Sequence, residues 1–138
     1  MICYAVIDTN VLVSALLSRN DDAATVQVLN MVLSGEIIPV YSKTITKEYR
    51  LVLSRKRFGF PGDLIEHLVL AIERFGILVD PQSTGIILPD MNDLPFYEAV
   101  LEKREDNAYL VTGNTKHFPQ EPFVVTPREL LDILNKTK

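Results

Sequence analysis

Acidic and amide side chains occur at four separate places along this sequence, each beside an expected strand end or helix start. They are Asp8 with Asn10, Glu48, Asp90 with Asp93, and Asn114. Carboxylates that converge repel one another unless they are protonated or neutralised by a cation, and oxygen ligands of this kind suit Mg²⁺ or Mn²⁺. A hard cation held in this way polarises a phosphoryl oxygen and lowers the pKa of a water. The chemistry indicated is metal-assisted hydrolysis of a phosphodiester.

Apolar, β-branched runs alternate with helical patterns along the whole chain. Strands are predicted at residues 2–7, 37–41, 77–79, 108–112 and 123–125, and helices at 9–18, 23–34, 43–54, 63–75, 94–104 and from 127 onward. Strands that alternate with helices predict an α/β fold with a mainly parallel sheet and helices on both of its faces. The carboxyl ends of parallel strands share one edge of the sheet, and open α/β sheets bind ligands there. Three of the four places follow strands or begin helices and are expected at that edge, whereas Glu48 lies inside a helix.

Capping residues mark several of the predicted helix ends. Ser42 and Asp93 are suited to be N-caps, and Thr126 to Glu129 reads as a capping box. Gly35 and Gly76 are expected to end helices. Asp8 also precedes a helix, so the alternative to a functional role is that its carboxylate only caps that helix.

Composition sets the outer limits of the interpretation. The chain has 138 residues, 47% of them hydrophobic, which is enough for one core and predicts a single domain over residues 1–138. The net charge of -4 means that attraction to a polyanion must come from a local basic patch or from bound metal. The single cysteine, Cys3, is expected to be buried in the first strand. No leader or membrane-length apolar run is present, so we expect a soluble, cytoplasmic protein with no membrane partner.

Basic side chains gather in the middle of the chain, whereas the phenylalanines are scattered along it. The basic ones are Lys43, Lys47, Arg50, Arg55, Lys56 and Arg57, and the phenylalanines are Phe58, Phe60, Phe75, Phe96 and Phe118. The basic side chains either contact an RNA backbone or form a solvated helix face. The phenylalanines either stack on bases or pack within the fold. His117 has similar alternatives, namely a phosphate contact, a proton donor or a surface histidine.

Four motifs in order resemble the PIN-domain family. They are Asp8-Thr9-Asn10-Val11-Leu12, Thr46-Lys47-Glu48-Tyr49, Asp90-Met91-Asn92-Asp93-Leu94-Pro95-Phe96 and Tyr109-Leu110-Val111-Thr112-Gly113-Asn114. With Lys116-His117-Phe118 after them, the chain is similar to a prokaryotic branch of the family that is identified as toxin components of toxin–antitoxin pairs. The resemblance covers nearly the whole sequence.

The resemblance implies a three-layer α/β/α fold with a five-stranded parallel sheet and an endoribonuclease that depends on Mg²⁺ or Mn²⁺. Carried over by position, the metal-binding acids would be Asp8, Glu48 and Asp93, with Asp90 and then Glu98 as further candidates. Asn114 completes the catalytic set and stands where many members of the family carry aspartate. Thr112, Lys47 and Lys116 would contact the substrate. Asn10 would contact the substrate or orient Asp8, and the alternative is that it only satisfies the first turn of the helix.

Two functions from different classes follow from this reading. The first is hydrolysis of RNA by an activated water, with products that by resemblance carry a 5′-phosphate and a 3′-hydroxyl. The alternative is an RNA- or partner-binding module that cleaves little, because Asn114 brings no charge to the site. The partners expected are RNA, a cognate antitoxin protein and a second copy of the chain in a homodimer.

Overall fold

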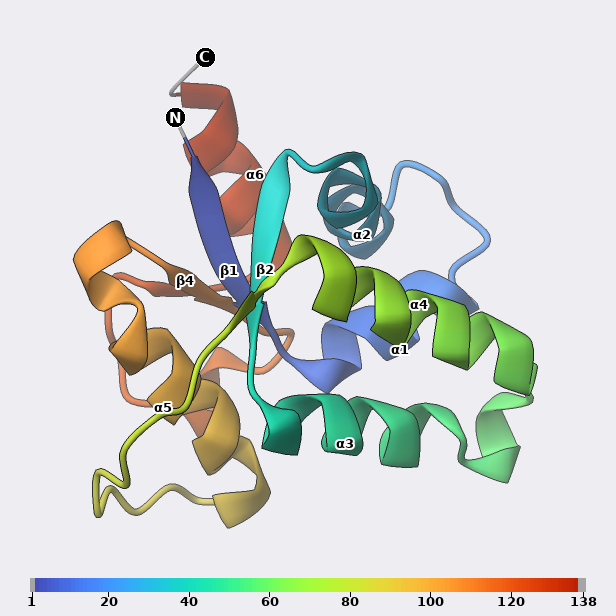
Figure 1. The fold of residues 1–138 in the computed structure, drawn as a ribbon. Coiled ribbons are helices and arrows are strands. Elements are labelled where there is room, and N and C mark those ends of the chain that lie inside the picture. Colours follow the sequence, from blue (N-terminus) through green and yellow to red (C-terminus); the bar gives the residue numbers. More distant parts are fainter. Residues whose placement is uncertain (1, 137–138) are drawn as a thin grey trace.

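Five parallel strands form the centre of the protein, which a computed structural model describes from residue 2 to residue 136 (Figure 1). The strand order is β3-β2-β1-β4-β5, so the chain starts in the middle strand and adds strands outward on both sides. The strands are β1 (Cys3–Ile7), β2 (Ile37–Tyr41), β3 (Ile77–Leu78), β4 (Tyr109–Val111) and β5 (Val124–Val125). The predicted α/β architecture with a parallel sheet is therefore confirmed.

Helices cover both faces of this sheet. The α-helices are α1 (Thr9–Leu17), α2 (Ala24–Ser34), α3 (Lys43–Leu53), α4 (Gly62–Phe75), α5 (Leu94–Glu102) and α6 (Pro127–Lys136). Short 3₁₀ turns are η1 (Lys56–Phe58), η2 (Met91–Asp93), η3 (Arg104–Asp106) and η4 (Thr115–His117). α5 packs on β1, β2 and β4, while α2 packs on β2 and contacts α1, α4 and α6 (Figure 1). α3 runs along the carboxyl edge of the sheet, where it pairs with α4.

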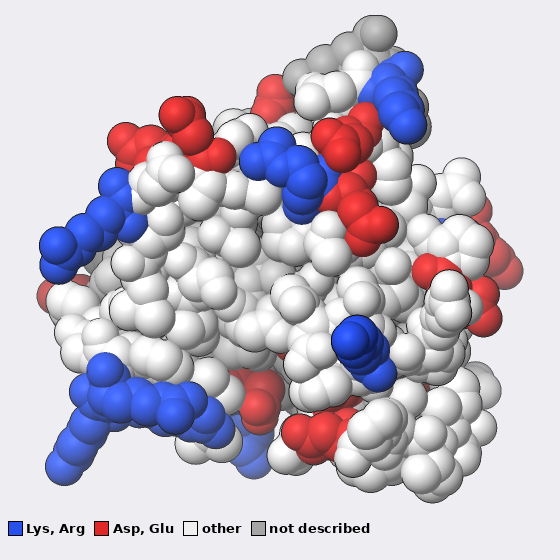
Figure 2. Space-filling model, turned by 180° about the vertical axis from the view of Figure 1, so that it is seen from behind, with Lys and Arg blue, Asp and Glu red and all other residues white. Residues whose placement is uncertain are grey.

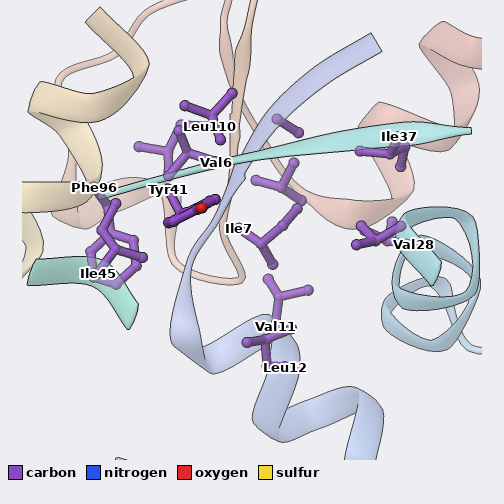
Figure 3. Close-up of a cluster of buried hydrophobic side chains, with 14 of the residues drawn as sticks. Val6, Ile7, Val11, Leu12, Val28, Ile37, Tyr41, Ile45, Phe96 and Leu110 are labelled. Atoms are coloured by element: carbon purple, nitrogen blue, oxygen red, sulfur yellow. The ribbon is translucent and has the colours of Figure 1, made fainter. Parts of the chain in front are cut away.

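The core lies between β1 and the helices on either side of it (Figure 3). Val6 and Ile7 of β1 are at most 1% exposed, and Phe96 of α5 is 2% exposed. Both faces of a parallel sheet are covered, which is why this strand is a continuous apolar run and not an alternating one. Cys3 is buried in the same strand, as predicted, and burial raises the pKa of its thiol to about 11.

Two of the predicted caps form as expected. The Ser42 hydroxyl accepts a hydrogen bond from the Ile45 N–H at 3.2 Å, which fixes the start of α3 at the end of β2. At α6 the capping box is reciprocal: Thr126 Oγ1 accepts from the Glu129 N–H, and Glu129 Oε1 accepts from the Thr126 N–H. In residues 2–136, no helix combines the length and the apolar character that crossing a bilayer requires.

Candidate active site

Asp8 occupies the carboxyl end of β1 and the N-cap position of α1. Its backbone N–H donates to the Val111 carbonyl at 2.9 Å, which ties the end of β1 to the end of β4. The residue is 6% exposed, yet its carboxylate makes no capping hydrogen bond to α1. Instead, Oδ2 accepts from Thr112 Oγ1 at 2.8 Å and from Asn10 Nδ2 at 3.2 Å. The interpretation of Asp8 as a helix cap alone is therefore wrong.

Thr112 connects the two central strand ends through its side chain. Its hydroxyl is fully buried, donates to Asp8 and accepts from the Asn114 N–H at 3.0 Å. The Asn10 amide lies on the same cluster, since its Oδ1 accepts from the Gly113 N–H at 3.0 Å. A hydroxyl has one proton to give and lone pairs to accept with, so this bonding fixes the direction of its proton toward Asp8. Both predicted substrate-binding side chains, Thr112 and Asn10, thus serve to orient Asp8.

Asp93 reaches the same region from the start of α5. The prediction that its side chain caps this helix is wrong, because its backbone is already helical and the side chain makes no capping bond. Asp90 provides a cap instead, accepting from the Asn92 N–H at 2.9 Å. Asp93 Oδ2 is buried, and among the described residues no hydrogen-bond donor is aligned on it. The Nδ1 atom of His117 lies 3.2 Å from this oxygen.

His117 links Asp93 to Asn114. Its Nε2 lies 2.8 Å from Asn114 Nδ2, and this contact is a hydrogen bond when Nε2 accepts. A neutral ring that accepts at Nε2 carries its proton on Nδ1, which is the nitrogen that faces Asp93. The arrangement makes Asn114 a partner of His117, a role that sequence reasoning did not foresee.

The electrostatics of the two aspartates indicate a site for a cation. The pKa of Asp8 is raised to about 6, chiefly by burial and also by the charge of Asp93, while the hydrogen bond from Thr112 acts in the other direction. The pKa of Asp93 is also raised, first by burial and then by Asp90, with His117 acting in the other direction. The charge of Asp93 makes Asp8 easier to protonate, and the charge of Asp90 does the same to the half-buried Asp93. A divalent cation relieves repulsion of this kind. The donor set fits Mg²⁺ or Mn²⁺, since Mg²⁺ is commonly held by one or two carboxylates together with waters and substrate phosphates.

The other predicted acids are placed differently. Glu48 is half-buried on α3, and no hydrogen bond or ion pair joins it to any described residue. Glu98 accepts from the backbone N–H and the hydroxyl of Thr84 at 2.7 and 2.9 Å, so it fixes the loop before η2. Within residues 2–136, no three His, Cys, Asp or Glu side chains are arranged as a metal-binding group. The structure therefore brings together Asp8 and Asp93, and leaves Glu48 outside their hydrogen-bond network.

One of the basic side chains considered for RNA contact, Arg50, is already engaged in ion pairs within the chain. Arg50 forms ion pairs with Glu66 at 3.0 Å and Glu73 at 3.1 Å and so connects α3 to α4. The side chains of Lys47 and Lys116 are exposed, and they stay predictions as substrate contacts.

Tyr49 is a residue of this region to which the sequence analysis assigned no role. Its hydroxyl donates to the Ile7 carbonyl, the peptide group directly before Asp8. The ring is 1% exposed, and burial raises the pKa of the phenol. The tyrosine thus holds α3 against the end of β1. No local signal in the sequence could predict the partner of its hydroxyl.

The fold and this site define an α/β protein with a buried acidic centre at the carboxyl edge of its parallel sheet. Residues 4–116 match the family model described as PIN domain, and the chain belongs to that family. Its members typically use divalent metals, and membership points to a nuclease as the class of protein. No curated protein and no solved structure matches the chain.

Replacing Thr112 by valine is expected to destabilise the protein by about 1–3 kcal/mol, because a buried N–H and a buried carboxylate each lose a partner. Urea denaturation measures this change. Thr112→Ser retains the hydroxyl and should recover most of the lost stability. A valine variant as stable as wild type would contradict the prediction and show that the hydrogen bonds of the Thr112 hydroxyl contribute little to stability.

Proposed function

We propose that this protein is an endoribonuclease that depends on Mg²⁺ or Mn²⁺ and acts as the toxin of a toxin–antitoxin pair. The observation that carries the proposal is the pair of carboxylates at the sheet edge, the buried Asp8 and the half-buried Asp93, whose pKa values are both raised. The toxin role is supported by the resemblance of the motifs up to Phe118 to the toxin branch of the family. The antitoxin is then a protein partner, and a homodimer is a further proposal.

Asp8 and Asp93 would hold the cation, and each has a distinct support within the chain. Once bound, a divalent cation polarises a phosphoryl oxygen and lowers the pKa of a water. Thr112 and Asn10 keep the Asp8 carboxylate in one orientation. His117 directs Nδ1 toward Asp93, where it is placed to hold or transfer a proton. The exposed Lys47 and Lys116 would attract the phosphates of the RNA.

Calorimetric titration with Mn²⁺ and Mg²⁺ tests the metal site directly. Wild type should give a heat of binding that Asp8→Asn and Asp93→Asn both lose. Asp132→Asn is a suitable control, because this exposed aspartate lies on α6. RNA cleavage, measured on the same four proteins, should follow metal binding. Equal binding by all four proteins would place the metal elsewhere and contradict the assignment.

The alternative function is a module that binds RNA or a partner protein and cleaves little. Asn114 favours it, because this residue is uncharged and its amide lies against His117. Restoring a carboxylate distinguishes the two functions. Asn114→Asp should strengthen Mn²⁺ binding and cleavage if the domain is an enzyme with a weakened site. A wild type and an Asn114→Asp variant that both bind RNA and both fail to cleave would support the module.

A further inference from the structure

We propose that the turn between α3 and α4, residues 55–60, is a second contact for single-stranded RNA, separate from the acidic centre. We call this segment the α3–α4 turn. The proposal rests on the proposed function, in which RNA is the substrate. It assigns to the chain a second site that binds the RNA strand at some distance from the phosphate that is cleaved. Four features of the segment support it: its charge, its aromatic stack, its position relative to Asp8 and the chemistry of its possible occupants.

The first feature is a group of three consecutive cations. The side chains of Arg55, Lys56 and Arg57 are exposed, and none of them forms an ion pair within the described part of the chain. By contrast, Arg50 is paired with Glu66 and Glu73, and Lys103 with Asp106. In a chain of net charge -4, this group forms a local positive field that attracts a polyanion.

The second feature is an aromatic stack built into the same turn. The Arg57 guanidinium lies 4.8 Å from the centre of the Phe58 ring, and that ring stacks on Phe60 at 5.6 Å with an interplanar angle of 17°. Phe60 also packs against the hydrophobic core, which anchors the stack. Bases of single-stranded RNA stack on aromatic rings and on guanidinium planes, and the cation adds attraction to the phosphates. The turn thus offers a surface on which bases stack and a positive charge that attracts phosphates, the two contacts that bind single-stranded RNA.

The third feature is the position of the turn along α3. The helix begins directly after β2, at the sheet edge that carries Asp8, and the Tyr49 hydroxyl holds it to the peptide before Asp8. Its 11 residues span about 16 Å. That length corresponds to about five stacked nucleotides. A strand cut at Asp8 and laid along α3 would therefore reach the α3–α4 turn (Figure 1).

The surface is consistent with this path. Figure 2 shows Lys and Arg side chains gathered at the lower left of the back face, over the region of α3 and the turn that follows it. Acidic side chains lie beside them toward the lower middle of the same view. Positive charge that leads toward an acidic, metal-binding centre favours entry of a phosphate backbone along this side.

The fourth feature is that the cations and the aromatic rings of the turn together suit a nucleotide better than an acidic protein segment. An acidic peptide would satisfy the cations, but it provides no flat π surface for the rings and the guanidinium. A nucleotide supplies a phosphate and a base together. We therefore assign the turn to single-stranded RNA and treat an acidic protein segment as the competing outcome.

Matched substitutions in the α3–α4 turn and at the carboxyl end of α4 test the assignment. Arg74 and Phe75 repeat the arrangement at the far end of that helix, with the Arg74 guanidinium 5.9 Å from the centre of the Phe75 ring. Arg57→Gln and Phe58→Leu are the test variants, and Arg74→Gln and Phe75→Leu are their controls. Binding of a labelled single strand longer than about five stacked nucleotides is measured by fluorescence anisotropy in EDTA, over a range of salt concentrations.

The two test variants should differ in how they weaken binding. Arg57→Gln should reduce the slope of log K against log salt by about 0.7, the value for one phosphate contact on a single strand. Phe58→Leu should weaken binding about tenfold and leave the slope unchanged, because it removes stacking and no charge. The two control variants should bind as wild type does.

Two results would overturn the assignment. One is equal binding by test and control variants, which would show that the turn does not contact RNA. The other is binding of an acidic peptide that depends on Arg57 and Phe58 while RNA binding does not, which would assign the turn to a protein partner. The assay needs neither metal nor cleavage, so it is independent of the proposed nuclease activity. If RNA binds through the α3–α4 turn but is never cleaved, the result would contradict the proposed nuclease activity and support the proposed RNA contact at the turn.

Discussion

Replacing Asp8 by asparagine is expected to stabilise the metal-free protein at neutral pH by about 3 kcal/mol. The fold raises the pKa of this carboxyl from 3.8 to about 6, chiefly because it is buried. The folded protein therefore bears the cost of an ionised carboxylate above pH 6, and a difference of this size in pKa corresponds to about 3 kcal/mol. Asparagine removes the charge and retains an oxygen that accepts from Thr112. Urea denaturation in EDTA near pH 7.5 measures the gain.

The way in which the free energy of unfolding depends on pH distinguishes an effect of the Asp8 charge from an effect of packing. A carboxyl whose pKa is higher in the folded state binds its proton more tightly there. Its stabilising contribution is thus complete below the unfolded pKa, near 4, and is lost as the pH rises through about 6. Wild type and Asp8→Asn should therefore have similar free energies of unfolding near pH 4 and separate as the pH rises. A constant difference across this range would mean that the charge of Asp8 is not responsible.

The same substitution is expected to reduce RNA cleavage about a thousandfold or more, because it removes a charged ligand from the proposed metal site. Metal should reverse the order of stability. At Mn²⁺ concentrations about a thousand times the dissociation constant, wild type should gain about 4.1 kcal/mol, which exceeds the difference of about 3 kcal/mol, whereas Asp8→Asn gains much less. Thermal melts with and without Mn²⁺ measure this reversal. The exposed Asp132→Asn control should change neither cleavage nor the response to metal.

The sequence predicted where the secondary structure begins and ends, because those signals are local. Strand positions follow from β-branched runs, and the Thr126 to Glu129 capping box forms with both of its bonds. The convergence of Asp8 and Asp93 at one edge could also be predicted, since parallel strands place their carboxyl ends together.

The bonding within the site could not be predicted from local signals. Asp8 and Thr112 are 104 residues apart, and their hydrogen bond depends on the exact register between β1 and β4. Asp93 has the sequence context of a helix cap, but its side chain lies against His117 instead. In both places a tertiary contact replaces the local hydrogen bond that the residue type favours. The caps that fail to form are thus the acids of the candidate site.

Gly76 shows that a position can be predicted correctly for the wrong reason. The sequence indicated that this glycine ends α4, as it does, but a glycine in this role usually adopts the left-handed conformation. Gly35 behaves in that way at the end of α2, with a φ of 87°. Gly76 is extended, with φ of -96° and ψ of -176°, which any residue adopts. What requires glycine here is space, because the chain passes directly against the backbone of β2 at Pro39.

Replacing Gly76 by alanine is therefore expected to destabilise the protein by about 3 kcal/mol or more. A Cβ at this position would overlap the carbonyl oxygens of Pro39 and Ile72, and both belong to the backbone, so neither can move aside as a side chain does. The strain would also reach β3, which begins at the next residue and pairs with the last two residues of β2. Urea denaturation measures the loss.

Gly62→Ala, at the first residue of the same helix, is the matched control. No atom lies within 4 Å of a Cβ built there, so the substitution should be neutral or stabilise by up to about 1 kcal/mol through the higher helix propensity of alanine. The same chemical change at the two ends of α4 should thus have very different effects on the free energy of unfolding. Equal effects would mean that the approach of Gly76 to β2 relaxes at little cost, and that α4 requires only a residue able to end a helix at this position.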